Sequence, residues 1–271
     1  MIYGLLAVDL DGTIVDKDLR ISARVRATLL RAQDAGVHVT LASGRPSGQM
    51  LAVAKDLSIH GPVICYQGAV VQDPDTQEVY LHHVVAVHLA REFIDFARRH
   101  GWSLCMFLDD QLYAERFTPE IRFFAEYSPI PEEVQVVEDL HRILGLAPTK
   151  LLVIVEAEEG ASVDAILQAR FAGRLKIVRS FPRFVEATSL AATKGQALAA
   201  LAQMLNVSRE QTVAIGDNDN DADMVAWAGL GVAMGNASPK VKAAADYIAP
   251  TIDADGAADA VERFILGAAH V

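Results

Sequence analysis

Apolar and polar positions alternate in blocks along the first third of the chain, and these blocks predict buried strands separated by helices. Residues 5–8 and 37–42 are short, largely apolar runs, which are typical of strands covered on both faces. Between them, Ser22 can cap a helix that ends at Gly36, because glycine readily adopts the left-handed conformation that closes a helix. The pattern predicts right-handed crossovers and a parallel sheet with helices on both faces.

The middle of the chain, residues 84–183, has a pattern of its own. It predicts helices over 87–100 and 161–171, a strand over 150–156 and further short strands. Such a set of elements can bury its own apolar core, so we expect a second α/β module here.

The first pattern resumes toward the end of the chain, with a predicted helix over 193–205 and a predicted strand at 213–215. A pattern that stops and later resumes indicates one domain interrupted by another. We therefore predict an α/β fold in which a Rossmann-like parallel-sheet core, residues 1–83 and 184–271, carries residues 84–183 as an inserted α/β cap domain.

The composition limits the possible classes of function. The chain has 271 residues, of which 52% are hydrophobic and 22% are charged, as in a globular protein with a substantial core. A net charge of −11 argues against nucleic acid and against anionic membrane surfaces, because both require a basic patch. The first apolar run meets a charge at Asp9, too early for a signal peptide or a membrane-spanning helix, so we expect a cytoplasmic protein.

Polar clusters lie at the carboxyl ends of the predicted core strands, where open α/β sheets bind their ligands. The clusters are Asp9-Leu10-Asp11-Gly12-Thr13, Ser43-Gly44-Arg45, Lys194 at a helix start, and Asp217 with Asn220 and Asp221. In a parallel sheet these strand ends meet at one edge. We therefore expect the four clusters to converge on one site.

The residue types in these clusters suit phosphoryl transfer. Of the carboxylates of Asp9 and Asp11, one can attack phosphorus while the other transfers protons. A carboxylate approaching a phosphate dianion meets a repulsion of ~4 kcal/mol per pair of unit charges about 4 Å apart at an effective dielectric of about 20. A divalent metal and Lys194 would offset this repulsion, and Asp217 adds an oxygen ligand of the kind that magnesium prefers. Lys194 and the Ser43 hydroxyl would hold the remaining phosphoryl oxygens.

Each cluster taken alone has a plainer interpretation. A single Asp-x-Asp at a strand end is more often turn chemistry than catalysis, and Arg45 alone could form an ordinary salt bridge, although its place after Ser43 favours a substrate contact. The loop that begins at Asp217 starts like an EF-hand, but Ala222 stands where glycine is required and Ala228 where the bidentate glutamate is required. The prediction of a catalytic site therefore depends on the four clusters together.

The clusters resemble the four motifs of the haloacid dehalogenase superfamily, and specifically its Cof-like sugar-phosphatase branch with a large α/β cap. The matching segments are Asp9-Leu10-Asp11-Gly12-Thr13, Ala42-Ser43-Gly44-Arg45-Pro46, Thr193-Lys194-Gly195 and Gly216-Asp217-x-x-Asn220-Asp221. The resemblance continues through residues 231–237 and 255–256 and so covers both parts of the predicted core. One departure is Gln67-Gly68-Ala69, where the branch usually has Asn-Gly-Ala.

The resemblance implies a role for each matching residue. It implies that Asp9 is the nucleophile and a metal ligand, that Asp11 is the general acid and base and gives its backbone carbonyl to the metal, and that Asp217 is a metal ligand. The other residues would bind phosphate or substrate or support the site: Ser43, Lys194 and Asn220 on the phosphate, Arg45 on the substrate, and Gly12 and Asp221 in support. We accordingly expect a Mg²⁺-dependent phosphatase that hydrolyses small phosphorylated metabolites, foremost sugar phosphates, through a phospho-aspartate intermediate.

Other functions stay open at this point. A sugar phosphomutase would share the fold and the aspartates, and the substrate of a phosphatase could instead be a flavin precursor or pyridoxal phosphate. A binding module that has kept the fold without the chemistry is a third possibility, but every expected catalytic position is filled.

Overall fold

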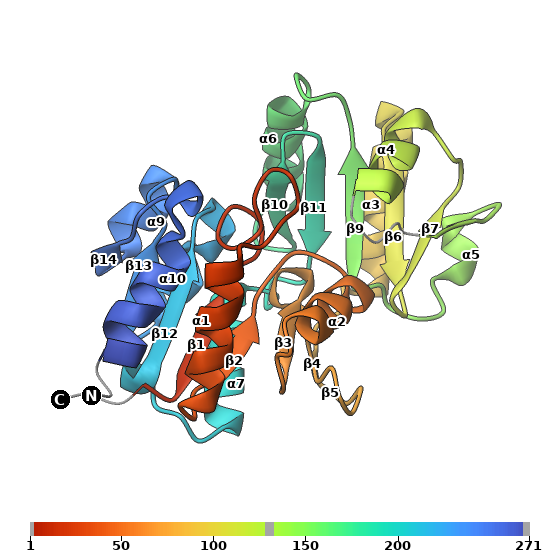
Figure 1. Ribbon diagram of the computed structural model, residues 1–271. Coiled ribbons are helices and arrows are strands. Elements are labelled where there is room, and N and C mark those ends of the chain that lie inside the picture. The colour runs from red at the N-terminus through yellow and green to blue at the C-terminus, as the bar shows by residue number, and fades with distance from the viewer. Residues whose placement is uncertain (1–2, 128–132, 268–271) are drawn as a thin grey trace. The chain divides into compact units, whose positions relative to one another are not determined.

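The computed structural model describes residues 3–127 and 133–267 of the chain, and these form two compact units (Figure 1). The first unit contains residues 1–81 and 193–271, and the second contains residues 82–192. The α/β fold class predicted from the sequence is confirmed, with a parallel sheet in the first unit and a separate sheet in the second.

The first unit is built on a five-stranded parallel sheet with the order β14-β13-β12-β1-β2. These strands are β1 (Leu5–Val8), β2 (His38–Leu41), β12 (Thr212–Gly216), β13 (Leu230–Ala233) and β14 (Tyr247–Ile248). Every residue of β1 and β12 is buried, because both strands are central and covered on both faces. A three-stranded sheet of β3 (Val63–Cys65), β4 (Val70–Gln72) and β5 (Val79–His82) follows in sequence.

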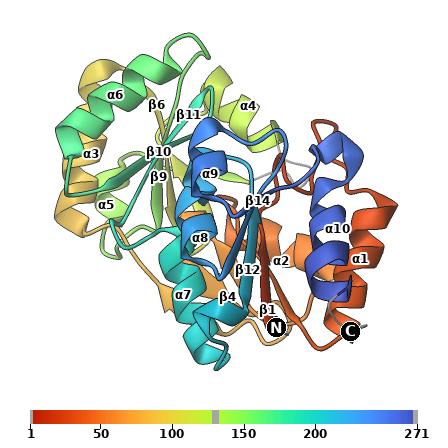
Figure 2. The same ribbon diagram turned by 90° about the vertical axis from the view of Figure 1, so that its left-hand side faces the viewer.

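Helices cover both faces of the parallel sheet, as predicted. Figure 2 shows α1 and α10 together on one face and α7 and α8 together on the other. The helices of this unit are α1 (Ala23–Asp34), α2 (Ser47–Asp56), α7 (Lys194–Met204), α8 (Ala222–Trp227), α9 (Pro239–Ala244) and α10 (Gly256–Val261). The Ser22 hydroxyl caps α1 by accepting a hydrogen bond from the backbone N–H of Val25, and Gly36 follows the helix with a φ of +84°.

The second unit contains a six-stranded sheet with the order β10-β11-β9-β6-β7-β8. Its pairs are antiparallel except for β7 with β8. The strands are β6 (Ser103–Leu108), β7 (Gln111–Ala114), β8 (Val134–Val136), β9 (Lys150–Ile154), β10 (Lys176–Phe181) and β11 (Phe184–Thr188). The helices are α3 (Val87–His100), α4 (Pro119–Tyr127), α5 (Leu140–Ile143) and α6 (Gly160–Phe171).

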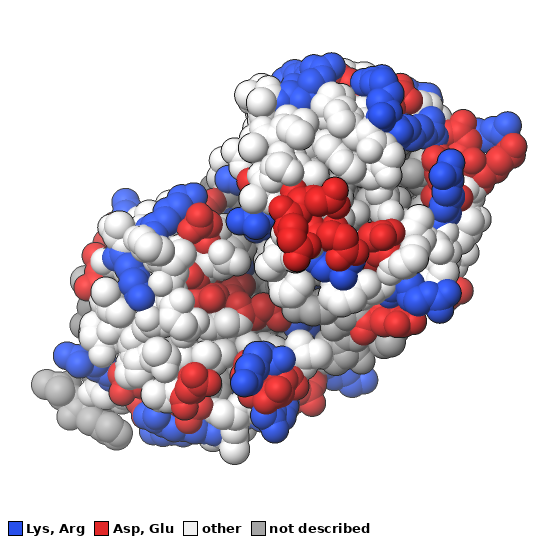
Figure 3. Space-filling view, turned by 90° about the horizontal axis from the view of Figure 1, so that it is seen from above, with Lys and Arg blue, Asp and Glu red and all other residues white. Residues whose placement is uncertain are grey.

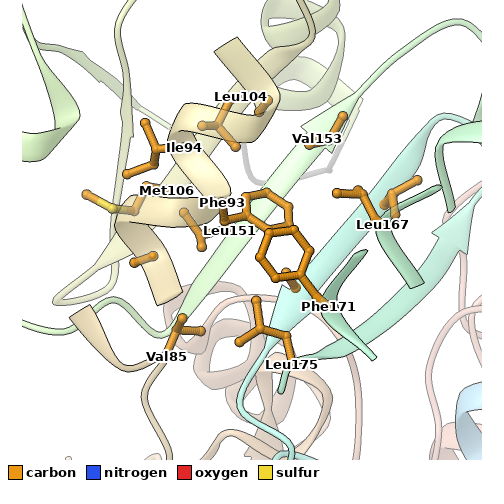
Figure 4. Close-up of a cluster of buried hydrophobic side chains, with 14 of the residues drawn as sticks. Val85, Phe93, Ile94, Leu104, Met106, Leu151, Val153, Leu167, Phe171 and Leu175 are labelled. Atoms are coloured by element: carbon orange, nitrogen blue, oxygen red, sulfur yellow. The ribbon is translucent and has the colours of Figure 1, made fainter. Parts of the chain in front are cut away.

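The core of the second unit lies between its sheet and the helices α3 and α6. Figure 4 shows Phe93 of α3 and Phe171 of α6 at the centre of this cluster, and their ring centroids are 5.2 Å apart. Leu151 and Val153 of β9 contribute the sheet side of the same core. This unit therefore buries an apolar core of its own, as the sequence pattern required.

The limits of the second unit differ from the predicted limits of 84 and 183. Strand β11 lies beyond residue 183, yet it pairs with β9 and β10 and so belongs to this sheet. Sequence reasoning placed the boundary too early because a buried strand looks the same in either domain. It stays a prediction that residues 1–83 and 184–271 act as a catalytic core and that residues 84–183 act as a cap.

Charged side chains of both signs are distributed over the surface. On the face shown in Figure 3, lysine and arginine side chains are scattered among aspartate and glutamate side chains. Within residues 3–127 and 133–267, no helix is both long enough and apolar enough to span a membrane.

Candidate active site

The site begins where two neighbouring strands of the parallel sheet end. Asp9 directly follows β1, and Asp217 directly follows β12. The two strands pair in register from Leu5 opposite Thr212 to Val8 opposite Ile215, and the Asp9 N–H donates to the Ile215 carbonyl at 3.0 Å. Because parallel strands bring their carboxyl ends to one edge, residues 208 positions apart in the sequence become neighbours.

Lys194 joins this edge from the first turn of α7. Its Nζ donates to Oδ1 of Asp9 at 2.6 Å and to Oδ1 of Asp221 at 2.5 Å, and all three residues are buried. Burial alone would lower the pKa of Lys194, but the charges of Asp221 and Asp9 outweigh it and raise that pKa. Lys194 is therefore a fixed positive charge at this site.

Asp221 has both carboxylate oxygens occupied by protein donors. Oδ1 accepts from Lys194, and Oδ2 accepts from the backbone N–H groups of Asp217 at 3.0 Å and Asn218 at 2.9 Å. The side chain is completely buried. These bonds fix the loop after β12, so Asp221 orients Asp217 and Lys194 while its own oxygens stay engaged.

The carboxylates of Asp9, Asp217 and Asp221 offer oxygen atoms that all lie within 4.8 Å of one another. Burial is the main cause that raises the pKa of Asp217 to about 6, and the negative charge of Asp221 adds to it. Burial and then the charge of Asp221 likewise raise the pKa of Asp9 well above its ordinary value, against the opposing effect of Lys194. Crowded carboxylates of this kind, two of them buried and one partly buried, fit a hard divalent cation, which would relieve the repulsion through oxygen ligands. Both oxygens of Asp221 accept from protein donors, whereas Asp9 and Asp217 each have one oxygen engaged by a protein donor, so Asp9 and Asp217 could hold such a cation more readily.

Gly12 brings the loop after β1 against Asp217. It has a φ of +90°, and a Cβ atom at this position would collide with the Asp217 carboxylate, so only glycine fits. Thr13 in the same loop donates from its hydroxyl to Oδ1 of Asp217 at 3.1 Å. Asn236 holds the loop from the other side by donating from Nδ2 to the Gly12 carbonyl at 2.8 Å. Sequence reasoning assigned no role to Thr13 or Asn236, although both stand inside the segments that carried the resemblance.

Arg45 and Asp11 form a bidentate ion pair. The Arg45 Nε and Nη2 atoms lie 2.9 Å and 2.5 Å from the two oxygens of Asp11. The Asp11 side chain keeps 53% of its surface exposed, whereas that of Arg45 keeps 14%. Ser43 is buried, and its hydroxyl accepts from the Arg45 backbone N–H at 3.3 Å. The structure thus brings the first and second clusters together through a salt bridge, the plainer of the two interpretations of Arg45, while its expected contact with the substrate stays a prediction.

Asn220 lies at the edge of the same cluster, on the 3₁₀ turn Asp219–Asp221. Its Nδ2 donates to Oε1 of Gln67 at 2.7 Å, and its own Oδ1 is buried without a hydrogen-bond partner among the described residues. Gln67 belongs to the turn Tyr66–Gly68 that follows β3. All the predicted site residues therefore lie in the first unit, with Gln67 as an additional member.

Comparison with known proteins places this fold and site in one family. The model of the haloacid dehalogenase-like hydrolases matches residues 6–261. The phosphatase YwpJ of Bacillus subtilis (strain 168) is 29% identical over 284 residues, which cover 96% of this chain and 99% of the relative. The 5-amino-6-(5-phospho-D-ribitylamino)uracil phosphatase YcsE of the same organism is 28% identical over 262 residues, which cover 97% of this chain and 96% of the relative.

A solved structure has the same architecture over nearly the whole chain. The crystal structure of a haloacid dehalogenase-like hydrolase from Bacteroides thetaiotaomicron superposes with a TM-score of 0.86 at 32% identity, covering 97% of this chain and 100% of that one. The parallel sheet with its carboxylate and lysine cluster thus defines a hydrolase that acts on phosphate esters. The chain belongs to the haloacid dehalogenase-like hydrolase family and is a phosphatase of its Cof-like branch, which confirms the resemblance seen in the sequence.

Proposed function

We propose that this phosphatase is Mg²⁺-dependent and hydrolyses a small phosphorylated metabolite of the sugar-phosphate type through a phospho-aspartate on Asp9. The observation that carries the proposal is the position of Lys194, which donates to Asp9 and Asp221 in a cluster that also contains Asp217. A buried ammonium beside crowded carboxylates offsets the charge that a phosphate dianion would add. Mg²⁺ held by Asp9, Asp217 and the Asp11 backbone carbonyl would supply further positive charge to the phosphoryl oxygens.

The two carboxylates of the first loop divide the chemistry between them. An Asp9 oxygen attacks phosphorus, the bond from phosphorus to the ester oxygen breaks, and Asp11 gives its proton to the departing alkoxide. Asp11, now ionised, takes a proton from a water molecule whose oxygen attacks the phospho-aspartate and releases inorganic phosphate. The exposure of the Asp11 side chain supports this role, because the group that serves leaving group and water must reach both.

The remaining residues bind and orient the substrate. Ser43, Lys194 and Asn220 would hold phosphoryl oxygens, since they contribute a hydroxyl, an ammonium and an amide at the same sheet edge. Arg45, which pairs with Asp11 in this structure, would contact the substrate. We further propose that the first unit is the catalytic core and that the second unit is the cap that selects the substrate.

The sugar-phosphate class has support from one relative. The name of YcsE describes a substrate that carries its phosphate on a ribityl chain, which is a polyol like a sugar. The same name keeps a flavin precursor open as an alternative. The matched relatives named above are phosphatases, so we favour hydrolysis over the mutase reaction.

A substrate screen combined with intermediate trapping tests this function. We expect purified protein to hydrolyse p-nitrophenyl phosphate and sugar phosphates with Mg²⁺, and to lose activity when EDTA removes the metal. Acid quenching during turnover should trap phosphate on the peptide that contains Asp9, as seen by mass spectrometry. Asp9→Asn should lower kcat by about 10³-fold or more without unfolding the protein. Phosphate release at an unchanged rate in Asp9→Asn would exclude the phospho-aspartate mechanism.

A further inference from the structure

The backbone of the turn after β3 adopts an unusual conformation at two consecutive residues. Tyr66 has a φ of +50° and Gln67 a φ of +60°, and neither is glycine. Residues other than glycine enter the left-handed region at an energetic cost, so contacts around this turn must hold the two residues there. Gln67 is also buried to 3% exposure, so its polar side chain must be bonded inside the protein.

The turn is tied to the loop that carries Ser43 and Arg45. The Gln67 N–H donates to the Ser43 carbonyl and the Tyr66 N–H donates to the Arg45 carbonyl, both at 3.0 Å. The side chain of Gln67 then lies over Gly44, because a Cβ atom on Gly44 would collide with the Gln67 carboxamide. The same turn packs against α7, which begins with Lys194.

The far end of the Gln67 side chain reaches the loop after β12. Its Oε1 accepts a hydrogen bond from Nδ2 of Asn220 at 2.7 Å. This bond fixes the Asn220 carboxamide and leaves the buried Oδ1 of Asn220 without a hydrogen-bond partner among the described residues. The Nδ2 amide carries two N–H groups, so the one that does not bond Gln67 can donate to a phosphoryl oxygen. The buried acceptor Oδ1 can in turn accept from a bound water.

We propose that Gln67 is a positioning residue for the phosphate site: its carboxamide spans from Gly44 to Asn220 and holds Asn220 in place to bind the phosphoryl group. The proposal rests on the function proposed above. The extra methylene of glutamine, relative to the asparagine usual in the branch, gives the side chain the length to make this bridge. Asparagine at position 67 tolerates the same left-handed backbone but would be shorter by one carbon–carbon bond.

Two variants at position 67 separate positioning from folding. Gln67→Met keeps the length and removes the hydrogen bond, whereas Gln67→Asn keeps the amide and shortens it. We expect each to lower kcat/KM for p-nitrophenyl phosphate about tenfold, which corresponds to the loss of one hydrogen bond to a positioned group. The inhibition constant of inorganic phosphate should rise by a similar factor. The thermal midpoint of Gln67→Asn should stay within about 3 °C of wild type.

Gln33 provides a matched control. Its carboxamide also bridges two backbone groups, because it donates to the Ser58 carbonyl at 3.0 Å and accepts from the His60 N–H at 3.2 Å. Gln33 lies on α1 near the start of β2, however, and not at the carboxyl ends of the strands. Gln33→Met should leave kcat/KM and phosphate inhibition unchanged. A glutamine that matters only for loop stability would behave like Gln33 in these assays.

A double-mutant cycle tests whether Gln67 acts through Asn220. If it does, Gln67→Met combined with Asn220→Ala should lose no more than about twofold beyond Asn220→Ala alone. The proposal would be overturned if the losses in kcat/KM of the two single variants multiplied in the double variant. It would also be overturned if variants at position 67 bound phosphate and turned over substrate like wild type. Calorimetric titration with inorganic phosphate and Mg²⁺ gives the same comparison without turnover. A wild-type protein without phosphatase activity would therefore refute the proposed function. The titration would still measure the role of Gln67 in binding phosphate.

Discussion

Lys194 and Asp9 form a buried ion pair of 2.6 Å at the carboxyl edge of the parallel sheet, although 185 positions separate them in the sequence. Neither charge has the solvent that would stabilise it alone, and Asp221 adds a second carboxylate to the same ammonium at 2.5 Å. The pair is therefore both a part of the proposed chemistry and a condition for the fold at this edge.

Replacing the Lys194 ammonium should show how much the stability of the fold depends on this ion pair. Lys194→Met leaves two buried carboxylates without their cation, so we expect the free energy of unfolding to fall by about 3 kcal/mol or more at pH 8. The loss should be smaller at pH 5, because a buried carboxylate whose pKa is raised can take up a proton instead. Urea unfolding at both pH values measures the difference. An equal loss at both would contradict the charge argument.

The pKa of Asp217, about 6, predicts how stability and metal binding depend on pH. Between its ordinary pKa of 3.8 and about 6, the folded protein holds the proton of Asp217 more tightly than the unfolded chain does. Without divalent metal, the free energy of unfolding should therefore decrease as pH rises through this range. Mg²⁺ should raise the thermal midpoint more at pH 7.5 than at pH 5, because protons compete with the metal for the carboxylate.

Two asparagine variants isolate the contribution of Asp217. Asp217→Asn should abolish most of the Mg²⁺-dependent rise in the thermal midpoint, whereas Asp253→Asn should leave it intact. Asp253 is an exposed carboxylate of the same unit outside the cluster, so it has the same change in charge. If both variants respond to Mg²⁺ like wild type, the ion does not bind at this cluster.

The sequence was sufficient to predict the sheet and the convergence of the charged clusters. Buried strands and helix caps are local signals, and Ser22 and the run that ends at Asp9 are found in the predicted positions. Parallel pairing of β1 with β12 then brings Asp9 next to Asp217 through topology alone. The polar clusters could be predicted to meet because a parallel sheet has only one carboxyl edge.

Contacts that depend on side-chain direction could not be predicted in this way. Arg45 was expected to face the substrate and pairs with Asp11, a contact set by the rotamers of two loop residues. Gln67 was noticed as a departure from the family, but its bond to Asn220 depends on a left-handed backbone that no local pattern indicates. The place of β11 in the second sheet likewise depends on tertiary pairing.

A second buried ion pair, in the other unit, allows a prediction about stability alone. The Lys150 Nζ atom lies 3.3 Å from Oε1 of Glu186 and 4.7 Å from the ring centroid of Phe107. Both charged residues are buried, since Lys150 is 1% exposed and Glu186 is 5% exposed. Lys150→Met should lower the free energy of unfolding by about 3 kcal/mol, because Glu186 is left buried without its cation. Lys150→Met combined with Glu186→Gln should recover part of this loss in urea unfolding. A double variant less stable than the single one would contradict this account.

When the leaving group is acidic, Asp11 should be needed more for hydrolysis of the phospho-aspartate than for its formation. p-Nitrophenolate departs without a proton, so Asp11→Asn can still form the phospho-aspartate from p-nitrophenyl phosphate but cannot activate the water that hydrolyses it. We expect a rapid burst of about one p-nitrophenol per active site, followed by a steady rate at least about 10²-fold below wild type. Asp9→Asn, which lacks the nucleophile, should give no burst in the same stopped-flow experiment. An Asp11→Asn protein that turns over steadily at the wild-type rate would assign the proton transfers to another group, and the exposed carboxylate beside Arg45 would then serve only to hold that guanidinium.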